Sequence, residues 1–570
     1  MKSSIVRRSA SLRAAPAFCA IILIYVISSL LVDPRAEFPL NDDWSYARSA
    51  FRFARENVVA VDEWSAPSLV GQTLYGGLLA RIFGPSFTVL RISTLILSCG
   101  LALILWRTLQ ALEVGNTTSW IVVLAWIFNP IQFSLSFTYM TEIPFAFFVG
   151  LGLFAMFRYV ETGRVGFLAA SGLVLGFATL IRQTAALFIA PMLLGLLLPG
   201  PGKPRREAWW RAALFAALAV PFLTFYYLWM AQRGGPTPAA RRKFELLGQL
   251  TAEQIVGNAY GMLFYAGFML LPLLICVLPS VRRSWRETAG PFRIVSLVVA
   301  LMIPGFGLWW FQGYSSRDYF PSRPYHGKMP FLLNILYDTG LGPLTLDTTY
   351  YAPVPSPVYP ALWIPVTIAV AGGCAVLILF CLLRGKRAAD LTGRDRTGLS
   401  ITGGAFVLIT AFEIVFSHLQ EGGLFDRHVL AAAYPLALFL AVLHSRSATA
   451  ARPAALLACA LTAVLAWVSI AGTRDYLAWN RIRWEMGNEL LARGVDPLQI
   501  AGGFEFNAWH NYDTFRARGQ VARVFHWWYD DPLYLISMDV EPGYQLLRKT
   551  EYGSWLHRRP IALYLLKKSG

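Results

Sequence analysis

Long apolar runs, separated by short polar segments, dominate the pattern of hydrophobic and polar positions along this chain. Each run is roughly 17–22 residues long, the length of a helix that crosses a bilayer. The least regular pair flanks Arg182 and fits either two short spans or one re-entrant hairpin. The pattern predicts thirteen spans, at residues 14–32, 86–106, 119–137, 143–160, 165–181, 184–199, 211–231, 259–279, 293–311, 359–383, 398–417, 428–445 and 453–471.

The loops between alternate spans are basic, and this sets a predicted orientation. They contain RYVETGR, PGKPRREAWWR, VRRSWRETAGPFR, LRGKRAADLTGRDR and HSRSATAAR. Cytoplasmic loops carry an excess of Lys and Arg, so we expect these loops and the N-terminus in the cytoplasm. The outer face then receives segments 33–85, 138–144, 231–254, 312–358, 417–428 and 472–570.

Basic residues precede the first apolar run, as they do in a secretory signal peptide. The run over residues 14–32 is longer than the apolar core of such a peptide, and no small-residue cleavage site follows it. We therefore expect an uncleaved first span.

Residues 472–570 have the mixed pattern of a small α/β domain. The segment RDYLAWNRIRWEMGNELLARG has apolar residues at helical spacing and ends at Gly494, while LQIAGG and IALYLL have the character of strands. We expect an all-α polytopic membrane domain over residues 1–471, with residues 312–358 as a long outer loop. A small extracytoplasmic α/β domain would follow over residues 472–570.

Composition agrees with a membrane protein and excludes a single soluble core. The 570 residues are 56% hydrophobic and only 15% charged, whereas soluble proteins carry roughly 25% charged residues. The net charge of +17 lies largely in loops between spans, so nucleic acid is not an expected partner. The six cysteines show no CxxC spacing, which argues against a disulfide framework or a zinc site.

Two adjacent aspartates, Asp42 and Asp43, follow the first span in the stretch FPLNDDWSYA. An amphipathic helix begins there, with Trp44 and Phe51 on its apolar face. Asn41 or either aspartate could cap that helix. Capping would explain one acidic residue and would leave its neighbour without a role.

Glu142 lies in the short outer turn TYMTEIP between two apolar runs. An ionisable group at that depth is costly unless it faces a cavity, which favours a functional role. The alternative is a carboxylate that complements the dipole of the helix beginning near Pro144.

Two basic positions could bind an anion near these carboxylates. Arg182 interrupts the apolar segment GFATLIRQTAALFI, and Arg427 with His428 stands at the mouth of the span in EGGLFDRHVLAAAYPLAL. A guanidinium fork matches the geometry of a phosphate. The alternatives are a salt bridge from Arg182 to Glu142 and an interfacial anchor at Arg427 and His428.

No nucleotide-binding or hydrolase signature occurs where its structural context would support it. ATP-driven chemistry is therefore not expected. Loop 312–358 mixes Tyr, Arg, His and Lys and could order over a lipid head group or a sugar, or serve as a solvated connector.

The motifs NDDWSYA, TYMTEIP, RQTAALF and FDRHVLAAAYP, in a chain with a cytoplasmic N-terminus, resemble the GT-C glycosyltransferases. Within them the chain is similar to the bacterial aminoarabinose transferase and protein O-mannosyltransferase group, the former in its thirteen spans and small outer domain. It departs from the family pattern at Glu142, where many relatives have Asp, and at Arg427–His428, where Arg-Tyr is frequent.

This resemblance implies transfer of a sugar from a polyprenyl-phosphate donor to an acceptor hydroxyl on a lipid, glycan or protein. The reaction would take place at the outer face of a bacterial inner membrane. Asp43 or Asp42 would act as general base, with Asp43 preferred because it adjoins the aromatic WSY segment. A single base opposite the leaving group predicts inversion at the anomeric carbon.

The remaining candidate residues would serve the donor and the acceptor. Arg182, Arg427 and His428 would bind the leaving phosphate. Glu142 would orient the acceptor or, with Asp42, a divalent cation.

A transporter or flippase of lipid-linked saccharides is the alternative from another class. It would also combine many spans with ionisable residues, but internal repeats and charges near the bilayer midplane would be expected. The sequence shows no repeat, and its acidic candidates stand at the outer ends of spans. An assembly or sensor subunit without activity is a third hypothesis.

Overall fold

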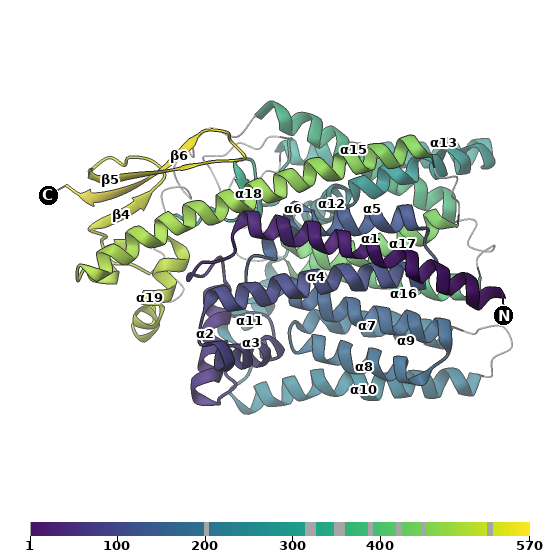
Figure 1. The fold of residues 1–570 in the computed structure, drawn as a ribbon, viewed down its shortest axis with the longest axis horizontal. Helices are drawn as coiled ribbons and strands as arrows, with labels where there is room; N and C mark the ends of the chain where they lie inside the picture. The colour runs from purple at the N-terminus through teal and green to yellow at the C-terminus, as the bar shows by residue number, and fades with distance from the viewer. Residues whose placement is uncertain are drawn as a thin grey trace.

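The protein is a bundle of long helices with a small sheet at one end, remote from the N-terminus (Figure 1). The computed structural model describes residues 2–198, 205–313, 327–346, 360–385, 392–417, 424–446, 451–520 and 528–569. Its largely helical chain and C-terminal sheet confirm the predicted fold class of an all-α membrane bundle with a small α/β part.

The described part of the chain consists mainly of helices. Through the first half of the chain they are α1 Lys2–Val32, α2 Asp43–Glu56, α3 Val70–Phe83, α4 Phe87–Ala111, α5 Asn116–Ile127, α6 Pro130–Leu135, α7 Glu142–Thr162, α8 Val165–Thr179, α9 Ala186–Leu197, α10 Arg205–Gln232, α11 Pro238–Glu245 and α12 Ala252–Glu287. The later helices are α13 Gly290–Gly313, α15 Pro360–Gly385, α16 Gly393–Phe416, α17 Val429–Ser445, α18 Arg452–Ala492 and α19 Phe504–Ala517. Short 3-10 turns lie at Gln183–Ala185, Leu246–Gln249, Asp426–His428 and Pro497–Gln499.

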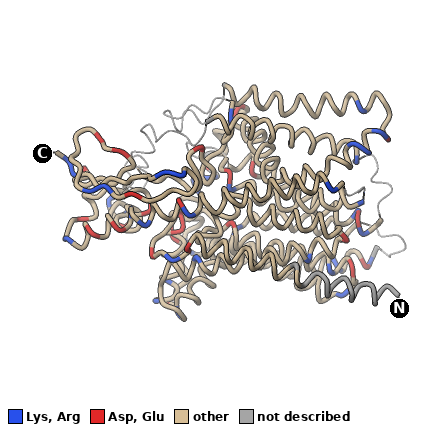
Figure 2. Tube along the Cα trace, turned by 45° about the horizontal axis from the view of Figure 1, so that its top comes forward, with Lys and Arg blue, Asp and Glu red and all other residues tan. Residues whose placement is uncertain are grey.

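The chain is a multi-pass membrane protein. In the described ranges, 9 helices are long and apolar enough to cross a bilayer, and shorter apolar helices lie at Phe18–Val32, Asn116–Ile127, Val165–Thr179 and Gln183–Leu197. Large apolar side chains such as Leu30, Met302 and Leu456 point outward, as lipid-facing residues do. Figure 2 shows charged residues gathered toward the two ends of the bundle, with mostly uncharged helix between them. Each predicted run contains helix, and the count of thirteen spans stays a prediction.

One predicted span is interrupted, and the two predicted spans that flank Arg182 are short helices. Within 119–137, α5 ends before Asn129, whose side chain accepts hydrogen bonds from the first amides of α6, and Pro130 starts the new helix. This is the usual chemistry of a helix start. On either side of Arg182, α8 and α9 are separate short helices joined through a 3-10 turn.

Arg91 of α4 fixes the loop that runs from the end of α1 to α2. Its buried guanidinium donates hydrogen bonds to the carbonyls of Pro34, Ala36, Phe38 and Phe137. An extended loop cannot satisfy these carbonyls by itself. One side chain thereby holds the turn before α2 beside the turn before α7.

The C-terminal sheet is carried on the outer part of α18. Its order is β3-β4-β6-β5, with β3 parallel to β4 and the other pairs antiparallel. Because α18 is continuous from residue 452 to residue 492, the predicted boundary between 471 and 472 falls inside one helix. The strands of this sheet are β3 Ile500–Ala501, β4 Tyr534–Ser537, β5 Tyr544–Gly553 and β6 Pro560–Lys568.

A hairpin packs between this sheet and the bundle. It consists of β1 Leu336–Tyr337 and β2 Gly340–Leu341, which pair antiparallel. It is part of the predicted loop 312–358, of which residues 314–326 and 347–359 lie outside the described residues, as do 418–423 of loop 417–428.

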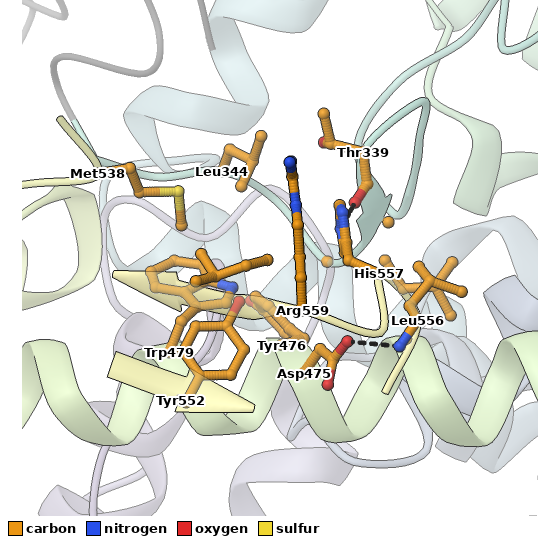
Figure 3. Close-up of a pocket in the computed structure, with 15 residues that line it drawn as sticks. Thr339, Leu344, Asp475, Tyr476, Trp479, Met538, Tyr552, Leu556, His557 and Arg559 are labelled. Atoms are coloured by element: carbon orange, nitrogen blue, oxygen red, sulfur yellow. Dashed lines mark hydrogen bonds between the residues drawn. The ribbon is translucent and has the colours of Figure 1, made fainter. Parts of the chain in front are cut away.

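A small pocket marks the seam where α18, the hairpin and the sheet meet (Figure 3). The Asp475 carboxylate accepts hydrogen bonds from the Ser554 hydroxyl and from the two backbone amides that follow it. Nε2 of His557 lies 2.8 Å from the carbonyl oxygen of Thr339 and donates to it. The polar groups of this pocket thus join the sheet and the hairpin to α18.

Asp475→Ala should loosen the sheet from α18. The substitution leaves a hydroxyl and two backbone amides without their acceptor, which should cost about 2–4 kcal/mol of stability. We expect a lower Tm and faster proteolysis within residues 553–560. Asp539→Ala is the control, because Asp539 is exposed and its carboxylate accepts a hydrogen bond from the adjacent amide of Val540. Equal protease resistance of the Asp475 variant and the wild type would contradict this assignment.

Candidate functional site

The adjacent aspartates at the start of α2 have different surroundings. Asp43 is 1% exposed, and its two carboxylate oxygens accept hydrogen bonds from the backbone amides of Leu40 and Tyr139. The side chain of Asp42 is 20% exposed and accepts from Nε1 of Trp64 at 3.0 Å. Asp42 occupies the N-cap position of α2, but its side chain makes no capping hydrogen bond.

Burial has an electrostatic consequence for Asp43. It raises the pKa of this carboxyl to about 8, while the hydrogen bonds from two amides and the nearby charge of Arg91 act in the opposite direction. Both oxygens are committed to the backbone, so Asp43 joins the turn before α2 to the turn before α7. Its geometry is that of a structural carboxyl group.

Arg427 brings together the carboxylates of two different turns, the one before α2 and the one before α7. Its Nη2 donates to Oδ2 of Asp42 at 3.2 Å, and its Nε lies 3.5 Å from Oε1 of Glu142. The same Glu142 oxygen accepts from Nη1 of Arg182 at 2.9 Å. The structure therefore joins Asp42, Arg427, Glu142 and Arg182, and the salt bridge from Arg182 to Glu142 is present.

Several buried polar atoms of this network make no hydrogen bond within the described part of the chain. In the described part of the chain, Oε2 of Glu142 and Nη1 of Arg427 are buried without a hydrogen-bond partner. Buried polar atoms are usually satisfied, so atoms left free call for an explanation such as a ligand. An additional acceptor such as a phosphate oxygen would satisfy the guanidinium.

A break in the helix places Arg182 in this network. The backbone at Arg182 is extended, between the end of α8 and the turn that leads into α9. The adjacent Gln183 side chain accepts from the amide of Ser68 and donates to the carbonyl of Ala66. These contacts hold the loop before α3 against the break.

Lys243 of α11 is a further member of the site that the sequence did not indicate. Burial, together with the charge of Arg182, lowers the pKa of Lys243 to about 8, and the charges of Asp42 and Glu413 raise it. The electrostatic contacts place its ammonium among the charged groups of the network. Its segment ARRKFE has the pattern of a solvated basic helix, which carries no signal for such a role.

His428 has partners of its own. Its Nδ1 lies 3.1 Å from the hydroxyl of Ser417 and 3.6 Å from a carboxylate oxygen of Glu413, and Ser417 donates to Glu413. Glu413, near the end of α16, was also missed, although it is the sole acidic residue of an otherwise apolar run. His428 is thus held against α16, while the adjacent Arg427 points to Asp42.

Asp426 fixes the segment that carries Arg427. Its buried carboxylate accepts from the amides of Ile335 and Leu336 at the start of the hairpin. Because Asp426 and Arg427 are adjacent, this contact sets the position from which the arginine reaches Asp42.

The residues present do not fit a divalent cation. No group of three or more His, Cys, Asp or Glu side chains suited to a metal ion gathers in the ranges that the structure describes. Asp42 and Glu142 instead face the guanidiniums of Arg182 and Arg427. These cations already compensate the carboxylates and would repel a metal ion.

The arrangement combines a carboxylate that can accept a proton with a group of cations that can bind an anion. Arg182, Lys243 and Arg427 are the cations, and the partly exposed Asp42 is the carboxylate. Such a pairing suits a reaction in which a hydroxyl is deprotonated while negative charge develops on a leaving group.

One segment of the chain matches a known protein-family model. Residues 75–231 match the family model described as dolichyl-phosphate-mannose-protein mannosyltransferase. The matched segment runs from within α3 to the end of α10 and includes Glu142 and Arg182. No curated protein matches the chain by sequence.

Among solved structures, the chain is similar to ArnT from Cupriavidus metallidurans. The apo structure shares 13% identity over 77% of this chain and 78% of that chain, with a TM-score of 0.32. The structure bound to undecaprenyl phosphate shares 13% identity over 75% and 76%, with a TM-score of 0.31. TM-scores this low do not establish a shared fold. Over residues 75–231 the chain is therefore similar to a family of GT-C membrane glycosyltransferases, in agreement with its sequence motifs.

Proposed function

We propose that the protein transfers a sugar from a polyprenyl-phosphate donor to an acceptor hydroxyl of a lipid, glycan or protein. The observation that carries this proposal is the direct contact between Asp42 and Arg427, a proton acceptor joined to a phosphate-binding cation. The family match of residues 75–231 supports the reaction class.

The site would open on the outer face of a bacterial inner membrane, with the N-terminus in the cytoplasm. Asp42 follows α1, Glu142 begins α7, and Arg427 precedes α17, so all three mark helix ends that meet at one side of the bundle. The basic segments between alternate spans belong to the opposite helix ends. Basic loops favour the cytoplasmic side, which supports an outer location for the network.

We assign the general base to Asp42, although the sequence alone favoured Asp43. A base must reach the acceptor hydroxyl within hydrogen-bond distance. Asp42 is partly exposed and accepts hydrogen bonds from the side chains of Trp64 and Arg427, whereas both oxygens of Asp43 are fixed by backbone amides. Asp43 is only 1% exposed, so an acceptor hydroxyl could not come within hydrogen-bond distance of it without a rearrangement of the turn.

In the proposed reaction, the donor phosphate binds Arg427, Arg182 and Lys243, and Arg427 exchanges Asp42 for phosphate oxygen. Asp42, held by Trp64, takes the proton of the acceptor hydroxyl as that oxygen attacks the anomeric carbon. The bond from this carbon to phosphate oxygen breaks, and its electron pair leaves with the phosphate. The three cations stabilise that charge.

The other members of the network would position these groups. Glu142 contacts Arg182 and Arg427, so we propose that it holds both guanidiniums toward the phosphate and borders the acceptor. His428, fixed by Ser417 and Glu413, would line the donor side. Attack from the side opposite the phosphate inverts the anomeric centre.

Asp42→Asn should abolish most sugar transfer and keep the fold. Loss of a general base lowers kcat by about 10²–10⁴-fold, while donor binding should persist because the cations remain. The measurement is transfer from radiolabelled polyprenyl-phosphate sugars to envelope acceptors by purified protein in lipid. Asp43→Asn should instead lower the Tm, because one backbone amide loses its acceptor.

Asp539→Asn, on the exposed surface, is the matched control for this experiment. If the Asp42→Asn variant keeps the wild-type kcat, Asp42 is excluded as the general base. Failure of the wild type to transfer any tested sugar would remove the proposed function, and a flipping assay would then test the transporter hypothesis.

Lys243→Arg should change how donor affinity depends on pH. Since burial lowers the pKa of Lys243 to about 8, the wild type should lose this positive charge as pH rises from 7 to 9. Affinity for a polyprenyl phosphate should then fall, by up to about tenfold per pH unit above the pKa. The arginine variant keeps its charge and should bind with little change over that range.

Arg242→Ala serves as the control for Lys243, because Arg242 is exposed on the same helix. Binding of a fluorescent polyprenyl phosphate in detergent at pH 7, 8 and 9 provides the measurement. A wild-type affinity that stays flat from pH 7 to pH 9 would exclude Lys243 as a phosphate ligand with this pKa.

A further inference from the structure

The turn that carries Asp42 is held by residues from distant parts of the chain. The amide of Asn41 donates to Oε1 of Glu505 at 2.8 Å across 464 positions. The Asn41 side chain donates to that of Asn334 at 3.1 Å. Asn41 has a φ of 57°, a left-handed conformation that asparagine tolerates better than most residues but that still needs support.

Glu505 is itself held firmly. Its second oxygen, Oε2, accepts from Nη1 of Arg483 at 2.8 Å and from the Thr345 hydroxyl at 2.6 Å. The side chains of Arg483 and Glu505 are both 0% exposed. A buried ion pair is a poor source of stability compared with apolar packing, and its best-attested use is to specify one geometry.

The backbone next to Glu505 is adapted to this ion pair. Gly503 has a φ of +90°, and a Cβ there would lie 2.6 Å from the Thr345 carbonyl oxygen and 2.7 Å from the Arg483 guanidinium. Only glycine permits this approach without displacing the pair. The chain before α19 is therefore built around the Arg483–Glu505 contact.

A second connection reaches Asp42 through Trp64. The ring of Trp64 packs against those of Phe504 and Trp528, with centroid distances of 5.9 and 5.1 Å, in a cluster that also contains Trp44. Its Nε1 donates to Asp42. Residues of the C-terminal region thus orient the group that bonds the proposed base.

We infer that Glu505 is a positioning residue for Asp42, and that residues 472–570 complete the active site. A separate domain that only presented an acceptor would need only surface contacts with the bundle, whereas Glu505 reaches the backbone amide of the buried Asn41, next to the base. This inference rests on the proposed function of Asp42, but the geometry of the turn can be measured without it.

Two double variants isolate the hydrogen bond to Asn41. Arg483→Met with Glu505→Gln removes both charges and keeps an acceptor for the amide, while Arg483→Met with Glu505→Met removes that acceptor too. Both double variants lose the Arg483–Glu505 ion pair, so the resulting loss of stability is the same in the two proteins. Glu485→Gln is the control, because Glu485 forms an exposed pair with Arg548 on the other face of α18.

We expect the Gln double variant to transfer sugar within about threefold of wild-type kcat. The Met double variant should lose about 10–100-fold in kcat, as misplaced supporting groups do, with KM for the donor unchanged. Amide hydrogen exchange over residues 38–46 should be faster in the Met variant only. A merely structural role would instead reduce the amount of folded enzyme and leave kcat per active site unchanged.

Equal kcat and equal exchange in the two double variants would overturn the inference. If neither double variant folds, Trp64→Phe decides, because it keeps an aromatic side chain in the cluster and removes the donor to Asp42. Its kcat should fall about tenfold at an unchanged Tm, and wild-type transfer would overturn the inference. If the wild type transfers no sugar, the proposed function fails, while the exchange comparison still tests whether Glu505 fixes the turn.

Discussion

Charge compensation away from water is the constraint on which the rest of this structure depends. Arg427 is only 8% exposed, and an unpaired charge at such a site costs several kcal/mol. It lies against Asp42 and Glu142, and Glu142 in turn pairs with Arg182. These residues stand at the ends of four different helical segments, so the ends must meet for the charges to be satisfied. The contacts that close the bundle at this end therefore also build the candidate site.

Apolar periodicity predicted the helical segments but not where the helices break or how far they extend. Residues 119–137 are apolar enough for one span, yet Asn129 and Pro130 form a helix start in the middle; that pair was a local signal of the break. Near residue 472 the change from apolar to polar residues was interpreted as the end of the last span and the start of a separate domain. Helix α18 continues to Ala492, because a change in polarity does not end a helix unless a capping or breaking residue accompanies it.

The site was predictable where an ionisable residue interrupts or borders an apolar run. Asp42, Glu142, Arg182 and Arg427 stand out for that reason, and the structure brings them together. Lys243 and Glu505 lie in polar segments, where charge is expected and gives no signal. The difference between Asp42 and Asp43 depends on the amide of Tyr139, 96 positions further along. Such a long-range contact leaves no trace in the sequence near the aspartates.

The pairing of Asp42 with Arg427 suggests how a base and an anion site can share one element. Without donor, the carboxylate and the guanidinium neutralise each other at 3.2 Å, so Oδ2 of Asp42 already has a partner. A phosphate that binds Arg427 takes the place of the Asp42 carboxylate. The guanidinium then keeps an anionic partner, while Asp42 loses its contact with Arg427. Asp43 is bonded to two backbone amides, and a phosphate could not replace it at either of them. In the proposed reaction, donor binding would therefore free Asp42 from Arg427, so the carboxylate becomes available to the acceptor hydroxyl only when a sugar is in place.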